Sequence, residues 1–200
     1  DRLVFAGQVH GNTVLKVNAA PEDGSAGEGD ALISDVPGLG LCAQTADCVP
    51  VLLADPETGA GAAIHSGWRG TVQNITATTI LAMSTAYGTR PRHLLAAIGP
   101  AITKENYRVG REVLDQFEAL FGALDSKLIT ARDDEDGAGL DVGEAVRRQL
   151  TGAGVLPGHI ERVEACTVAE EDRFFSSRRA AANGHAGAFG GQVGVIGLRR

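Results

Sequence analysis

"CVPVLLADPETGAGAAIH", residues 48–65, contains the pattern that decides the fold. Two apolar runs flank the segment 55–59, whose Asp, Pro, Thr and Gly residues are typical of a tight turn. The pattern predicts two antiparallel strands joined by that turn. Cys48 opens the first strand and His65 ends the second, so we expect the two side chains to lie at the same end of the pair.

The flanking segments predict an α+β fold with mixed β-sheets flanked by helices. Several strands precede the first helix, which excludes a regular βαβ array. The length of 200 residues suits one domain, residues 1–200, and because the chain opens directly on a strand we expect an N-terminal segment to be missing. Polar, glycine-rich loops are expected at 21–30 and 132–139. Further strands are predicted at 2–10, 14–17, 31–34, 39–43, 93–100, 160–167 and 191–198, and helices at 71–87, 110–122 and 140–154.

Composition narrows the class of protein. The formal net charge is −7, and without a cluster of basic residues the chain is a poor candidate for binding nucleic acid. The apolar runs are short and interrupted, so no membrane span is expected. Three cysteines, an odd number, do not form a disulfide framework, and with no visible signal peptide they predict reduced thiols in a cytoplasmic protein.

Three side chains are candidates for a metal site. His10 and His65 each follow an apolar run and are followed within two residues by glycine, and Cys48 begins a strand. Two imidazoles and a thiolate suit zinc, with copper as the alternative, and three protein ligands leave one position open, as in catalytic zinc sites. Taken singly, each residue also fits a structural interpretation, as a hydrogen-bonded histidine at a sheet edge or a small buried cysteine.

Arginines and an aromatic residue lie near these candidates. Arg69 is expected just before a helix starting near Thr71, where an anion is favoured, and its guanidinium suits phosphate. Trp68 is a candidate for stacking on a flat ring or for the core. The arginine pair Arg178 and Arg179 indicates either an anion-binding site at the rim of the cluster or an edge where both side chains are solvated.

Together these segments resemble the YfiH-like family, also named the multicopper polyphenol oxidoreductase or laccase-domain family. The resemblance implies that His10, Cys48 and His65 bind zinc or copper. It also implies phosphorolysis of purine nucleosides, accompanied by adenosine deamination. The matching motifs are "QVHG" (8–11), "GDALIS" (29–34), "TADCVPVLLAD" (45–55), "HSGWRG" (65–70), "IGPAI" (98–102) and "CTVAEEDRFFSSRR" (166–179).

The leading hypothesis is therefore a zinc-dependent purine nucleoside phosphorylase acting on adenosine, inosine or methylthioadenosine. Its partners are the nucleoside and phosphate, and it would be a monomer or homodimer. Arg69 and Arg178 would hold phosphate, and Asp47 would orient a ligand or act as a base.

Three alternatives remain. A copper polyphenol oxidase would need on the order of ten histidines, whereas the chain has five. A cysteine hydrolase would use Cys48 as nucleophile and His65 as base. An interaction domain would use the acidic loop 132–139 as its partner surface.

Overall fold

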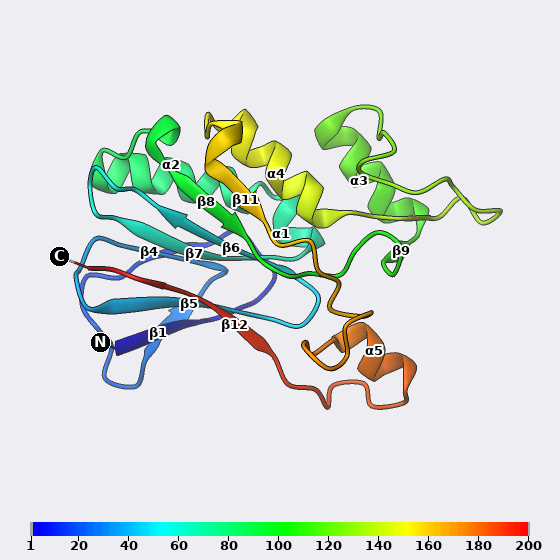
Figure 1. Ribbon diagram of the computed structural model, residues 1–200, viewed down its shortest axis with the longest axis horizontal. Helices are drawn as coiled ribbons and strands as arrows, with labels where there is room; N and C mark the ends of the chain where they lie inside the picture. The colour runs from blue at the N-terminus through cyan, green and yellow to red at the C-terminus, as the bar shows by residue number, and fades with distance from the viewer. Residues whose placement is uncertain (1, 200) are drawn as a thin grey trace.

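The computed structural model describes residues 2–199, so Asp1 and Arg200, the ends of the predicted domain, lie outside the described residues. The chain forms three layers (Figure 1): helices cover one face of a six-stranded sheet, and a four-stranded sheet packs on the other. This arrangement confirms the prediction of mixed sheets flanked by helices.

The predicted strand pair lies in the six-stranded sheet. Strands β6 (Val49–Ala54) and β7 (Gly61–Ser66) pair antiparallel, and the register places Val49 opposite Ser66 and Ala54 opposite Gly61. Cys48 and His65 therefore lie at the same end of the pair, as predicted. The order across this sheet is β11 (Ile160–Arg162), β8 (Leu95–Ile98), β6 (Val49–Ala54), β7 (Gly61–Ser66), β4 (Ala31–Ser34) and β2 (Val14–Lys16).

The segment 2–17 differs from the prediction of two strands around a turn. β1 ends at Gly7 and lies in the four-stranded sheet, whereas β2 lies in the six-stranded sheet. His10 is consequently in the loop that crosses between the two sheets. The segment 21–30, expected to be loop throughout, contains strand β3. The four-stranded sheet runs β12 (Gln192–Gly197), β5 (Leu39–Thr45), β1 (Arg2–Gly7) and β3 (Ser25–Glu28), and β9 (Arg108–Val109) pairs with β10 (Ala138–Gly139).

The helix expected from Thr71 is two helices. The first, α1, spans Trp68–Val72 and the second, α2, spans Ile75–Tyr87. Asn74, in the left-handed conformation at φ 60°, separates them. A left-handed residue cannot continue a right-handed helix, which explains the break. Every helix within residues 2–199 is too short or too polar to span a bilayer. The helices are α1 (Trp68–Val72), α2 (Ile75–Tyr87), α3 (Arg111–Phe121), α4 (Val142–Gly152) and α5 (Ser177–Ala182), with 3₁₀ turns at Pro91–His93 and Pro157–His159.

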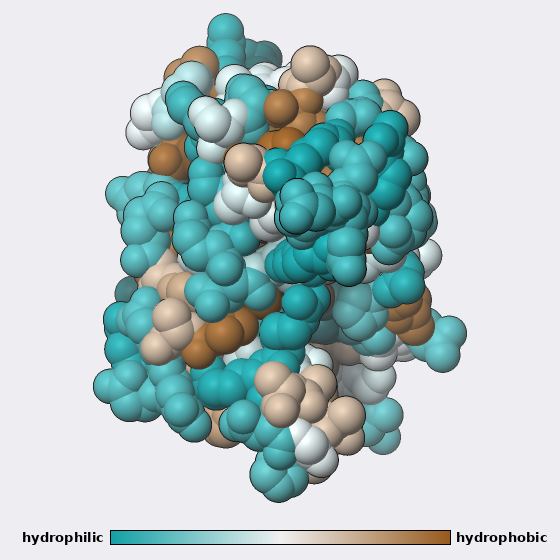
Figure 2. Space-filling model, turned by 90° about the vertical axis from the view of Figure 1, so that its right-hand side faces the viewer, coloured by the Kyte–Doolittle hydropathy of each residue, from teal (hydrophilic) through white to brown (hydrophobic). Residues whose placement is uncertain are grey.

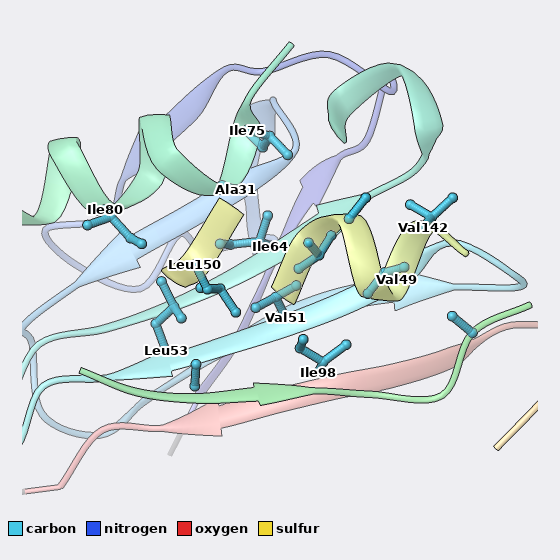
Figure 3. Close-up of a cluster of buried hydrophobic side chains, with 14 of the residues drawn as sticks. Ala31, Val49, Val51, Leu53, Ile64, Ile75, Ile80, Ile98, Val142 and Leu150 are labelled. Atoms are coloured by element: carbon cyan, nitrogen blue, oxygen red, sulfur yellow. The ribbon is translucent and has the colours of Figure 1, made fainter. Parts of the chain in front are cut away.

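The core has two parts because the six-stranded sheet is covered on both faces. Ile64 and Val51 point toward α2 and α4 (Figure 3), whereas Ala63 points toward the four-stranded sheet and packs near Leu41. Strands buried on both faces have nearly continuous apolar sequences, which explains the run in β6. Each buried Ile, Val or Leu side chain contributes about 1.5–3 kcal/mol. The strand ends that carry Cys48 and His65 are thereby fixed by a rigid layer.

Candidate functional site

His10, Cys48 and His65 come together at one end of the strand layers. Their ligand atoms all lie within 4.8 Å of one another. The Cys48 Sγ is 3.8 Å from His10 Nε2, and the two imidazole rings meet edge to face with centroids 4.7 Å apart. The structure thus places the three predicted residues close enough to share an ion, while their role as ligands stays a prediction.

Asp30, which the sequence analysis did not select, supports two of the three residues. Its buried carboxylate lies 2.8 Å from His65 Nδ1. The same carboxylate accepts hydrogen bonds from the backbone N–H groups of His10 at 2.9 Å and Gly11 at 2.7 Å. Those bonds hold His10 in the left-handed conformation, φ 61°, which is unfavourable for a residue with a side chain. Asp30 therefore orients His65 through its Nδ1 and fixes the turn that presents His10.

The electrostatics of the cluster favour a thiolate. Burial opposes ionisation of Cys48, but hydrogen bonds and charge from His10 and His65 outweigh it and lower the pKa of the thiol to about 7. Burial likewise disfavours charge on His65, yet Asp30 and Cys48 raise its pKa to about 9. A thiolate is the form of cysteine that binds metal.

The donor set and the space around it fit a metal ion. Asp30 occupies His65 Nδ1, so Nε2 remains for coordination, as in carboxylate–histidine–metal arrangements. Gly67 closes the cluster, and a Cβ there would lie 3.0 Å from both Cys48 Sγ and His10 Cδ2. The His–Cys–His cluster can therefore hold a metal ion, and the soft thiolate with two imidazoles suits zinc or copper.

The cluster opens into a cavity of about 580 Å³, a size typical of small-molecule sites. Trp68, Arg69, Tyr107, Arg178 and Phe189 line it, together with Gln8, Gln44, Thr45 and Asp47. Figure 2 shows the end of the molecule that carries α3, β9 and α5, where hydrophilic side chains predominate and the surface is hollowed between its upper and lower halves.

Arg69 and Arg178 both line this cavity, and each rests on an aromatic ring. The Arg69 guanidinium lies 4.5 Å from the centroid of Trp68, and that of Arg178 lies 5.0 Å from the centroid of Tyr107. Neither arginine belongs to any ion pair within residues 2–199, although many arginines elsewhere in the chain are paired. Two unpaired guanidinium groups in one cavity favour an anion there.

Arg179, the neighbour that the sequence could not distinguish from Arg178, has a different environment. Its guanidinium donates to the backbone carbonyls of Thr167, Val168 and Phe174. These bonds anchor α5 to the segment before it. Arg179 is therefore committed to the fold, whereas Arg178 lines the cavity and makes one long bond, 3.4 Å, to the backbone carbonyl of Arg108.

Asp47 lies between the cluster and α5. Its Oδ1 accepts from the Thr167 hydroxyl at 2.7 Å, and its Oδ2 accepts from the backbone N–H of Arg178 at 2.7 Å. The residue adopts φ 99°, which these bonds help to maintain. Because both oxygens are engaged, the geometry favours the orienting role over that of a base.

Sequence reasoning missed Asp30, Tyr107 and Phe189. Asp30 carried a local signal, since it is a carboxylate directly before the fully buried strand β4. Tyr107 and Phe189 reach the cavity from segments remote in sequence, and only the tertiary structure brings them there.

Comparison with known proteins finds one family model that matches almost the whole chain and relatives that match much of it. The family model described as multi-copper polyphenol oxidoreductase laccase matches residues 1–199. A purine nucleoside phosphorylase of Bacteroides thetaiotaomicron is 44% identical over 151 residues, which are 75% of this chain and 55% of that protein. The chain thus spans about half the length of that relative.

Two further comparisons cover more of the chain. Adenosine deaminase RL5, from an unknown prokaryotic organism, is 35% identical over 191 residues, 92% of this chain and 72% of that protein. The crystal structure of the hypothetical protein YfiH of Bacillus licheniformis superposes with a TM-score of 0.88 at 32% identity, covering 98% of this chain and 74% of that one.

Proposed function

This chain belongs to the multi-copper polyphenol oxidoreductase laccase family, with the fold of YfiH, and from that premise we propose that it is a metal-dependent purine nucleoside phosphorylase. The relatives named for this activity support the substrate class. The observation that carries the proposal is that the His–Cys–His cluster and two unpaired arginines line one cavity.

In the proposed reaction an oxygen of hydrogen phosphate attacks C1′ of the nucleoside. The bond from C1′ to the base breaks, its electron pair stays with the base, and the proton of the phosphate ends on the base. Arg69 and Arg178 bind the phosphate and hold it against C1′, which lowers the entropic part of the barrier. The products are the free base and ribose 1-phosphate.

His10, Cys48 and His65 would hold the metal, for which we propose zinc. Bound there, it would supply Lewis-acid polarisation of a substrate oxygen or nitrogen. Asp30 keeps His65 in the tautomer that presents Nε2, and Gly67 leaves space beside Cys48. We also propose adenosine deamination as an accompanying activity, supported by the relative of that name. The free state of all three cysteines supports a cytoplasmic location.

A cysteine hydrolase is the second candidate, because Asp30, His65 and Cys48 lie in the order of a carboxylate, base and nucleophile. His10 has no function in that arrangement, although it lies against Cys48. Alkylation separates the two: a nucleophilic Cys48 reacts with iodoacetamide at the same rate with or without zinc, whereas a ligand is protected by zinc. A polyphenol oxidase with several coppers is disfavoured, because only His10 and His65 of the five histidines line the cavity.

The test is release of free base from adenosine with and without phosphate. Arg69→Gln and Arg178→Gln should each raise the KM for phosphate about tenfold or more, the loss expected for a charge-assisted contact. Arg90→Gln, at an exposed arginine outside the cavity, is the matched control and should leave it unchanged. Base release without phosphate, or an unchanged KM in both variants, would reject the proposal.

A further inference from the structure

Three large aromatic side chains line the cavity, and two already have partners. One face of Trp68 carries Arg69, and one face of Tyr107 carries Arg178. Both rings are also partly buried against the main core. Phe189 is 45% exposed and, within residues 2–199, takes part in no aromatic or cation–π pair. Of the three, Phe189 therefore has a ring face available for a ligand.

The segment that carries Phe189 also lies against polar groups of the cavity wall. A Cβ at Gly191 would be 3.3 Å from the carbonyl oxygen of Thr45, so the backbone passes close to the end of β5. Thr45 lines the same cavity, and its buried hydroxyl has no hydrogen-bond partner among the described residues. Gln44, beside it, is exposed and also lines the cavity.

We propose that the purine ring of the nucleoside stacks on Phe189, in a subsite that includes the hydroxyl of Thr45. This inference rests on the proposed function for the identity of the ligand. A purine is flat and aromatic with polar edges, so it matches a cavity whose wall includes an open phenyl face and a residue whose hydroxyl lacks a partner. The arginines, each stacked on its own ring, bind the phosphate, and Phe189 binds the base.

The subsite is tested with Phe189→Leu, which removes the ring but retains an apolar side chain. The KM for adenosine should rise about fivefold or more, the lower end of measured base–aromatic stacking. The KM for phosphate and the zinc content should stay unchanged. Phe189→Tyr keeps a ring and should keep the KM for adenosine near that of the unmodified protein.

Phe175→Leu is the matched control. Phe175 is 53% exposed and packs against Gly190 in the same segment, but it does not line the cavity. If Phe189 only supported the segment, both leucine variants would raise the KM for adenosine equally, and the proposal would be overturned. A rise confined to Phe189→Leu supports stacking.

A binding measurement separates failure of this subsite from failure of the proposed function. Trp68 is the chain's single tryptophan and lines the cavity, so its fluorescence can report adenosine binding. If the unmodified protein binds adenosine but releases no base with phosphate, phosphorolysis is rejected while the subsite is still decided by the Phe189→Leu titration. No adenosine binding to the unmodified protein, or equal binding by the variant, overturns the subsite.

Discussion

Replacing Asp30 by asparagine should weaken metal binding more than any other change outside the three ligands. The Asp30 carboxylate receives His65 Nδ1 and the His10 backbone N–H on one oxygen, and the backbone N–H groups of Gly11 and Val9 on the other. An asparagine has one acceptor oxygen and one NH₂ group. Whichever way the asparagine amide is turned, its NH₂ group faces two of these donors, so the two hydrogen bonds on that side are lost.

The magnitude follows from those contacts. Hydrogen bonds to a charged group each contribute about 1.5–3 kcal/mol, so losing one or two should lower the free energy of unfolding by about 2–5 kcal/mol. Removing the carboxylate behind a metal-binding histidine typically lowers metal affinity about 10- to 100-fold. Urea unfolding measures the first quantity, and competition with a zinc chelator measures the second.

Asp55→Asn is the matched control. Asp55 is also buried and accepts hydrogen bonds from Glu57 N–H at 3.0 Å and the Thr58 hydroxyl at 2.8 Å, but it lies at the opposite end of the β6–β7 pair. It should lower stability without changing zinc affinity. If Asp30→Asn binds zinc as tightly as Asp55→Asn does, the assigned role of Asp30 is wrong.

Three other changes give distinct expectations. Gly67→Ala places a Cβ 3.0 Å from Cys48 Sγ, so the zinc affinity, measured by chelator competition, should fall while circular dichroism shows an intact fold. An unchanged zinc affinity would contradict the close packing of Gly67 against the His–Cys–His cluster. Asp47→Ala removes the acceptor for the backbone N–H of Arg178, so the KM for phosphate should rise and the free energy of unfolding should fall by about 1–3 kcal/mol. An unchanged KM would show that the position of α5 does not depend on this contact. Burial of Glu144 raises its pKa, but hydrogen bonds from two arginines of α4 outweigh this and lower the pKa below 4.5. The stability that Glu144 contributes is therefore present above pH 4.5 and is lost as the pH falls through the folded-state pKa. Glu144→Gln should reduce the fall in the free energy of unfolding between about pH 5 and pH 3, measured with urea, and an unchanged pH dependence would refute this.

The β6–β7 pair shows which part of the fold can be predicted from the sequence. Its two apolar runs and the Asp-Pro-containing turn are local signals, and they predicted both the antiparallel pairing and the shared end of Cys48 and His65. Helix α3 likewise followed from apolar residues at helical spacing, and α4 from a helical segment that ends in glycine. Patterns of this kind depend only on residues that are close in the sequence, so they can be recognised in a single amino-acid sequence.

Other features depend on contacts between distant segments. The sequence predicted that β1 and β2 pair with each other, but β1 pairs with β3 and β5, and β2 pairs with β4. No local pattern distinguishes this pairing from a hairpin. The separate roles of Arg178 and Arg179 follow from which carbonyl groups the fold places nearby. Phe189 reaches the cavity only because β12 pairs with β5.

Identification of the sugar product tests the central proposal most directly. The purified protein with zinc, adenosine and phosphate should yield ribose 1-phosphate, seen as a new ³¹P resonance, in equal amount to the total free base, adenine plus any hypoxanthine. Cys48→Ala should abolish the signal while the domain stays folded. Release of adenine with free ribose and no ribose 1-phosphate, or full activity in Cys48→Ala, would contradict phosphorolysis at this site.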